Sequence, residues 1–232
     1  MSTAVLLIVA AVVLWAGLRE AGRRADAVAD RARNERDGNF DAQRGVDTDG
    51  EIPIERFGMA PDVVARAERY MPTDPESLFE AVAFIGIDPA RFTFIDLGCG
   101  KGRALIMASE LKFRRIIGVE IVPDLADIAC ANLASLGIAA EVRTMDAMLF
   151  VFPPGPVVLF LYNPFVATVL EAVIENLRTA DIPELFILYK NPRCGSLLDA
   201  SGFLTGLGAR PVGKARSVVE IWRRADDLVA AP

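Results

Sequence analysis

The sequence predicts an α/β protein whose core is a doubly wound, mainly parallel sheet, preceded by one transmembrane helix. Three observations lead to this prediction. Short apolar runs alternate with helical patterns from residue 61 onward, a glycine-rich loop follows the first strand-like run, and residues 4–18 contain no charged side chain. Continuous apolar strands that alternate with helices are typical of a parallel sheet covered on both faces.

The totals narrow the class of protein. The chain has 232 residues, enough for one domain with appendages, and its formal net charge of −6 does not favour a nucleic acid as partner. It contains no histidine, which removes the commonest general base and a common metal ligand, so we expect no metal site. The three cysteines form no CxxC pair, which favours free thiols in a reducing compartment.

The N-terminal segment is predicted to be a membrane anchor. Residues 4–16 read AVLLIVAAVVLWA, and the apolar stretch up to residue 18 is only slightly shorter than a spanning helix needs. A signal peptide would carry a basic residue before the apolar core, although cleavage of the segment stays open. Arg residues follow the span between positions 19 and 36 and none precedes it, so the positive-inside rule places the body in the cytoplasm, at the inner membrane.

Three regions are therefore expected. They are a transmembrane anchor over residues 1–18, a charged helix and linker over residues 19–60, and a folded domain over residues 61–232. Within the second region, residues 19–37 are rich in Ala and Arg, as in a charged helix, and residues 37–53 are rich in Gly, Asp and Asn, as in a linker or loop.

The domain begins with two helical patterns over residues 61–70 and 75–86, each opened by a proline. Apolar runs then predict strands over residues 92–97, 115–120, 140–145, 157–162, 184–190 and 216–223, and the terminal strands are candidates for an antiparallel edge. Between them, helical spacing predicts helices over residues 102–111, 123–136 and 166–178.

Three glycines mark the loop after the first strand. The stretch DLGCGKG, residues 96–102, places Gly98, Gly100 and Gly102 at every second position before a helix. Glycine permits close backbone approach, and the amides at a helix N-terminus hold anionic groups. Ligands of open α/β sheets bind beyond the carboxyl ends of the strands, where this loop lies. The spacing differs from the dinucleotide pattern G-x-G-x-x-G because Arg103 takes the place of its last glycine.

Acidic residues accompany this loop. Asp96 ends the first strand, Glu120 ends the second at the place where an acid can bind ribose hydroxyls, and Asp146 follows the third. The combination of DLGCGKG and GVEI, over roughly residues 61–222, resembles class I S-adenosylmethionine (SAM)-dependent methyltransferases. This resemblance implies a Rossmann-like fold with SAM as cofactor. It implies that the glycine loop lies under the methionine part of SAM, that Glu120 accepts both ribose hydroxyls, and that Asp146 with Ala147 meets the adenine.

The upstream segment YMPTD, residues 70–74, resembles the Y-x-P-T element of membrane-anchored protein lysine methyltransferases of the ATP synthase c-subunit type. Those enzymes also have an N-terminal apolar segment. The resemblance implies that Tyr70 and Thr73 close over the carboxylate end of SAM. An ordinary loop after a helix, containing a proline, is the alternative interpretation.

The segment LYNPF, residues 161–165, ends the fourth strand and resembles the (N/D)PP(Y/F) motif of amino-group methyltransferases, with one proline where that motif has two. The resemblance implies that Asn163 orients the acceptor nitrogen and that the ring of Phe165 packs on it. A plain strand-to-helix turn is the alternative. A second pair, Asn191-Pro192, is expected to line the same cleft.

The sequence therefore predicts a membrane-anchored SAM-dependent methyltransferase that acts on an unknown acceptor, with nitrogen as the leading candidate and protein lysine as one acceptor of that kind. A methyltransferase of a small molecule or lipid is the alternative within enzymes, and a non-catalytic SAM- or nucleotide-binding module tethered to the membrane is the alternative from another class. The stretch GARPVGK, residues 208–214, matches a phosphate-binding loop up to its lysine, but Ala215 stands where Ser or Thr must bind Mg²⁺, so nucleotide hydrolysis is not expected.

Overall fold

The structure is a computed structural model that describes residues 19, 39–213 and 217–225. The predicted anchor over residues 1–18 and nearly all of the predicted charged helix lie outside the described residues. Within the part of the chain that is described, no helix combines the length and apolar character that crossing a membrane requires.

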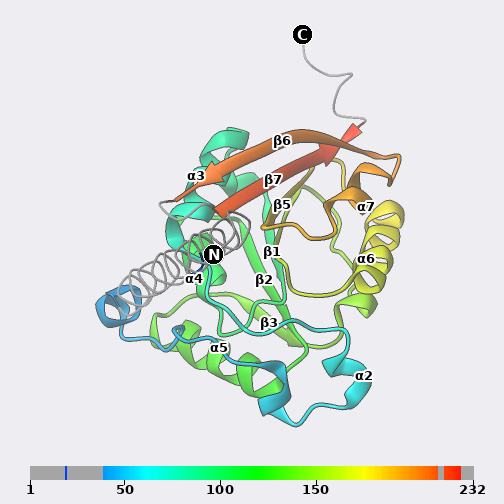
Figure 1. Ribbon diagram of the computed structural model, residues 1–232. Helices are drawn as coiled ribbons and strands as arrows, with labels where there is room; N and C mark the ends of the chain where they lie inside the picture. The colour runs from blue at the N-terminus through cyan, green and yellow to red at the C-terminus, as the bar shows by residue number, and fades with distance from the viewer. Residues whose placement is uncertain (1–18, 20–38, 214–216, 226–232) are drawn as a thin grey trace, which may run out of the picture.

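One sheet of seven strands forms the centre of the molecule, in the order β3-β2-β1-β4-β5-β7-β6 (Figure 1). Strands β1 to β5 pair in parallel, whereas β7 runs antiparallel to both β5 and β6. The chain order reverses between β1 and β4, which is the place where doubly wound sheets bind ligands. The strands are β1 Thr93–Leu97, β2 Arg115–Glu120, β3 Glu141–Thr144, β4 Val157–Tyr162, β5 Leu185–Lys190, β6 Leu204–Val212 and β7 Ser217–Arg224.

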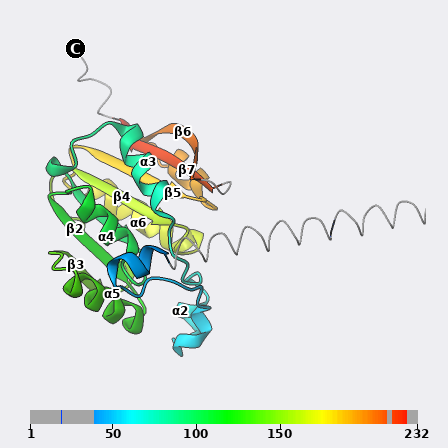
Figure 2. The same ribbon diagram turned by 90° about the vertical axis from the view of Figure 1, so that its left-hand side faces the viewer.

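Helices cover both faces of this sheet (Figures 1 and 2). Alternate side chains of β1 pack on opposite faces of the sheet, because successive side chains of a strand point to opposite sides. Phe94 packs in one apolar cluster with Leu78 and Leu105, and Ile95 packs in the other with Val173. The first cluster lies under α3 Pro75–Ile85, α4 Arg103–Glu110 and α5 Pro123–Ser135, and the second under α6 Ala167–Thr179 and α7 Gly195–Asp199.

The prediction of a doubly wound, mainly parallel sheet is confirmed, and two of its strands begin and end where the apolar runs do. The predicted helix over residues 61–70 is wrong beyond its first turn, since α2 covers only Pro61–Val64. Residues 65–71 leave the helix and cross the carboxyl ends of the strands, where Ala67 bridges to Phe165 and Tyr70 bridges to Ile52. We call residues 65–71 the crossing segment.

Strand β6 was not predicted. Its sequence, LTGLGARPV, contains two glycines and a proline, which are depleted in strands. β6 is the edge strand of the sheet, where a proline is tolerated because one side of the strand makes no ladder hydrogen bonds. Most of GARPVGK therefore belongs to an edge strand, and its resemblance to a phosphate-binding loop is coincidental.

Residues 39–53, which were expected to be a linker, pack against the domain. Residues 39–44 are helical, and the side chains of Phe40 and Thr48 are buried. The backbone N–H of Asp47 donates to Asn132 Oδ1 at 2.9 Å, and Asn132 Nδ2 donates to the Asp47 carbonyl oxygen at 2.7 Å. The segment therefore holds α5 and the glycine loop from outside, and the folded unit includes residues before position 61.

Candidate functional site

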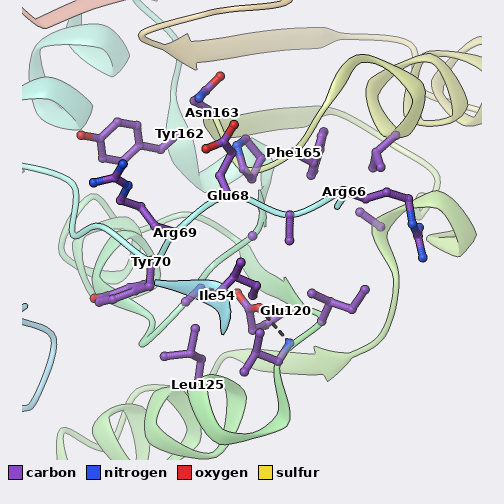
Figure 3. A pocket seen from close by; sticks show the side chains of 18 of the residues that line it. Ile54, Arg66, Glu68, Arg69, Tyr70, Glu120, Leu125, Tyr162, Asn163 and Phe165 are labelled. Carbon is purple, nitrogen blue, oxygen red and sulfur yellow. Dashed lines mark hydrogen bonds between the residues drawn. The ribbon is translucent and has the colours of Figure 1, made fainter. Parts of the chain in front are cut away.

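A cavity of about 230 Å³ opens at the carboxyl ends of β1, β2 and β4 (Figure 3). It lies at the reversal of strand order, where the loops after these strands separate. The crossing segment forms one of its walls. This wall is joined to the loop after β4 by two backbone hydrogen bonds, from Glu68 N–H to the Pro164 carbonyl oxygen and from Val166 N–H to the Arg66 carbonyl oxygen, both at 3.2 Å.

The glycine loop lines this cavity through Gly98 and Gly100. Gly100 has φ of 52°, and a Cβ atom placed there would lie 2.3 Å from Cε2 of Tyr70. The phenol of Tyr70 donates to the Thr48 carbonyl oxygen at 2.6 Å, so the ring has little freedom to move away. Gly102 lies outside the cavity and is the N-cap residue of α4.

Glu120, the last residue of β2, is the acid most closely tied to this loop. Its Oε2 accepts a hydrogen bond from Gly100 N–H at 2.8 Å, and its Oε1 accepts one from Val122 N–H at 2.9 Å. Burial raises the pKa of Glu120, and the backbone donors partly offset that rise. Glu120 therefore holds the glycine loop in place by a hydrogen bond, and it also lines the cavity.

A smaller cavity of about 30 Å³ adjoins the first one and shares Tyr70 and Gly98 with it. Asp96 and Thr73 line this second cavity and do not reach the first. Asp96 is buried, and burial, followed by the neighbouring Glu120, raises its pKa well above the ordinary range. A carboxyl in this position has a strong electrostatic preference for a cationic group beside it.

An ion pair between the buried Lys190 and the partly exposed Asp74 contacts Thr73, which lines the second cavity. Lys190 Nζ lies 2.6 Å from Asp74 Oδ2 and donates to Thr73 Oγ1 at 3.2 Å. Asp74 also caps α3, because its Oδ1 accepts from Ser77 N–H at 2.9 Å. Burial raises the pKa of Asp74, but the charge and hydrogen bond of Lys190 outweigh that effect, and the net pKa is lowered.

Asp146 and Ala147, which follow β3, also line the larger cavity. Asp146 Oδ1 accepts from Met148 N–H at 2.9 Å, which caps the short 3-10 helix η3, Ala147–Leu149. Its Oδ2 lies 2.7 Å from the guanidinium of Arg66. The Asp146 carboxylate therefore already has partners, and its predicted contact with adenine must compete with Arg66.

Asn163 and Phe165 reach the larger cavity from the loop after β4. Asn163 has φ of 43°, a left-handed conformation that Asn tolerates better than most residues. Its Oδ1 accepts from the phenol of Tyr189 at 3.4 Å. Burial, followed by the neighbouring Cys194, raises the pKa of Tyr189 to about 12, so its phenol stays protonated and able to donate. Phe165 is mostly buried and packs against the second core cluster.

Four polar side chains at the cavity were not predicted: Arg66, Glu68, Arg69 and Arg193. Three of them belong to the crossing segment, which the helical pattern of residues 61–70 concealed. Glu68 Oε1 lies 2.8 Å from the guanidinium of Arg193, which follows β5. Asn191, which was expected at this cleft, does line the cavity. Within the described residues, no group of three or more His, Cys, Asp or Glu side chains could hold a metal ion.

The site therefore unites most of the residues that the sequence singled out. Every predicted site residue except Gly102 lines one of the two adjoining cavities. Their individual roles toward a ligand stay predictions.

Comparisons with known proteins bear on the fold. No protein-family model matches the chain, and no curated protein matches it. Solved structures do match. A protein from Escherichia coli described as a methyltransferase, yhhF, has a TM-score of 0.53 at 20% identity, over 65% of this chain and 85% of the other. A SAM-dependent methyltransferase from Aquifex aeolicus has a TM-score of 0.50 at 15% identity, over 66% of this chain and 90% of the other.

The PH0226 protein from Pyrococcus horikoshii OT3 is similar to the same extent, with a TM-score of 0.52 at 15% identity, over 64% of this chain and 88% of the other. These comparisons do not support the narrower resemblance to membrane-anchored protein lysine methyltransferases. Of these structures, the Aquifex aeolicus protein is described as a SAM-dependent methyltransferase and yhhF as a methyltransferase. The chain therefore has the Rossmann-like α/β fold of class I SAM-dependent methyltransferases.

Proposed function

We propose that this chain is an enzyme that transfers a methyl group from SAM to an acceptor, with nitrogen as the leading acceptor atom. The observation that supports this most is the position of Glu120. Its buried carboxylate accepts the Gly100 N–H at 2.8 Å and lines the same cavity as Asn163. One space thus adjoins a glycine loop, an acid at the end of the second strand and a polar side chain at the end of the fourth.

The residues present fit SAM. The missing side chain of Gly100 leaves room for the ring of Tyr70, which lines both cavities beside the glycine loop. Glu120 would hold the ribose hydroxyls, and Asp146 with Ala147 would border the adenine. The smaller cavity would take the methionine end, where the buried Asp96 is suited to a positively charged group.

SAM, when bound, supplies a methyl group on a positively charged sulfur. The chain's own residues contribute orientation, which can account for ~7–11 kcal/mol of a barrier in favourable cases. Asn163 is suited to orient an acceptor because, among the residues that the structure describes, its side-chain oxygen has only a long contact, 3.4 Å, with the Tyr189 phenol. Phe165 presents an aromatic ring at the same end of the cavity, and such rings attract cationic groups, whereas the ring of Tyr162 already has Lys190 Nζ 4.2 Å from its centroid.

The test uses Asn163→Gly, because glycine removes the amide and also tolerates the left-handed backbone. SAM affinity, measured by calorimetry, is expected to stay within about twofold, while the transfer of labelled methyl into fractionated lysate falls roughly 10–10³-fold, as for loss of a positioning or charge-stabilising donor. Lys112→Gly is the matched control, since Lys112 has φ of 62° and lies outside both cavities.

Different outcomes lead to different conclusions. Full transfer by Asn163→Gly would mean that LYNPF is only a turn. Failure of the unmodified chain to bind SAM would overturn the proposed function and favour a non-catalytic module. The fraction that takes up label distinguishes a protein acceptor from a lipid or a small molecule.

We also propose that residues 4–18 anchor the protein in the inner membrane, with the domain in the cytoplasm. The uncharged run and the Arg residues that follow it support this topology. A reporter fused after residue 232 is expected to be active only in a form that works in the cytosol. Periplasmic activity, or a mature N-terminus after residue 18, would contradict it.

A further inference from the structure

The acceptor end of the larger cavity carries a carboxylate that the proposed chemistry has not used. Glu68 belongs to the crossing segment, and its backbone N–H donates to the Pro164 carbonyl oxygen at 3.2 Å. This hydrogen bond fixes Glu68 beside the residue that follows Asn163. Figure 3 shows the Glu68 carboxylate on the side of the cavity where Asn163 lies.

We propose that Glu68 binds the acceptor, by receiving a cationic amine group and holding its nitrogen beside Asn163. The ammonium passes one proton to the Glu68 carboxylate or to water, and the freed lone pair then takes the methyl group, whose bond to the sulfur of SAM breaks to leave a neutral thioether. The proposal rests on the proposed methyl transfer and makes its acceptor more specific. Oxygen acceptors at this end come from Glu68 and Asn163, and an aromatic ring comes from Phe165. Carboxylates bind ammonium groups through charge-assisted hydrogen bonds, and aromatic rings add cation–π attraction.

The ion pair with Arg193 is compatible with this role. Arg193 contacts only Oε1 of Glu68 in the described structure, at 2.8 Å, and a carboxylate can accept several donors on its two oxygens. The side chain of Arg193 is 68% exposed, whereas that of Glu68 is 30% exposed. An ion pair with a largely exposed partner contributes little to stability, so an incoming ammonium group can share the Glu68 carboxylate with Arg193 or displace Arg193 at small cost.

The acceptor class makes the inference testable before the natural acceptor is known. The probe is n-butylammonium, with butyrate as its anionic counterpart, titrated by NMR into the full chain in detergent after saturation with S-adenosylhomocysteine. Butylammonium is expected to bind, and Glu68→Gln is expected to weaken it roughly tenfold or more, the scale of a hydrogen bond to a charged group. Glu68→Asp is expected to retain part of the affinity.

Two controls separate a direct contact from other effects. Glu171→Gln removes the same charge from an exposed position on α6 outside both cavities, and it is expected to leave butylammonium affinity unchanged. Arg193→Gln tests whether Glu68 acts only by holding Arg193. Retained butylammonium binding in that variant supports a direct contact, and a loss equal to that of Glu68→Gln would overturn it.

The failure of this inference can be told from the failure of the proposed function. If S-adenosylhomocysteine does not bind, both are overturned. If it binds normally in every variant but butylammonium binds equally to the unmodified chain and to Glu68→Gln, or to neither, the role of Glu68 is overturned alone. Preferential binding of butyrate would also overturn it and would favour Arg193 as the residue that binds the ligand.

Discussion

Replacing Gly100 by alanine is the sharpest test of how the glycine loop is built. Two costs follow from the structure. The residue must keep φ near 52°, which costs a non-glycine residue about 1–2 kcal/mol. The new methyl would also lie 2.3 Å and 2.4 Å from two ring carbons of Tyr70. Forcing extra atoms into a packed site costs about 1–3 kcal/mol, so Gly100→Ala is expected to lose roughly 2–5 kcal/mol of unfolding free energy.

Gly137 provides the matched control for the backbone cost. It has φ of 64°, and a Cβ atom added there would meet nothing within 4 Å. Gly137→Ala therefore carries only the left-handed strain. The difference between the two variants isolates the contact with Tyr70, about 1–3 kcal/mol, which corresponds to roughly 2–12 °C in melting temperature for a chain of this size.

The assay combines thermal unfolding and SAM calorimetry on the full chain in detergent. Gly100→Ala is expected to weaken SAM at least tenfold, because it displaces the Tyr70 ring that borders both cavities. In the double variant with Tyr70→Ala, the ring that clashes with the new methyl is absent, so Gly100→Ala is expected to cost only the strain of the left-handed backbone. A double-mutant cycle detects this difference in unfolding free energy as a coupling between the two positions. Equal melting temperatures and equal SAM affinities for Gly100→Ala and Gly137→Ala would refute the reasoning.

Three further predictions concern the acids of the site and their partners. Because burial raises the pKa of Asp96, and a cation favours the ionised form, SAM affinity is expected to rise with pH until Asp96 is ionised in the free protein; calorimetry on Asp96→Asn should show a weaker pH dependence. Lys190→Ala is expected to cost about 1–3 kcal/mol in denaturant unfolding, since it leaves the partly exposed carboxylate of Asp74 without its charged partner. The stabilisation tied to the lowered pKa of Asp74 is present above the ordinary Asp range and is lost as pH falls through the lowered value, so Lys190→Ala should flatten the acid limb of a stability profile. Glu120→Ala is expected to weaken SAM by about 1.5–3 kcal/mol and also to lower the melting temperature, because it leaves the Gly100 N–H unpaired, whereas Glu120→Gln, which keeps an acceptor oxygen, should lose less stability.

The strongly periodic parts of the chain could be predicted without coordinates. The runs RIIGVE and VVLFLY coincide with β2 and β4, because a strand buried on both faces must be apolar at nearly every position. The helix after YMPTD was also predictable, since Asp74 caps it and Pro75 occupies its first turn. The edge strand β6 could not be predicted, because its glycines and proline interrupt the apolar pattern of a strand. An edge strand tolerates these residues because it pairs with a neighbouring strand on one side only.

Long-range contacts decided the rest. Residues 65–70 have helical spacing, yet hydrogen bonds to Pro164 and Ile52 outweigh a weak local preference and draw them across the strand ends. Because residues 65–70 cross the strand ends, Arg66 forms an ion pair with Asp146, and Glu68 forms one with Arg193. The members of each pair are many residues apart in the chain.

The sequence by itself determined the layered fold and the positions of the glycine loop, Glu120, Asp146 and Asn163. These follow from local rules, since burial sets strand composition and the carboxyl ends of parallel strands meet at one edge. Only the tertiary structure decided which charged side chains form the wall of the cavity. It also decided that Glu120 holds the loop and that Asp96 and Thr73 face a second cavity. No local pattern encodes these contacts, because each depends on the packing of segments that are distant in the chain.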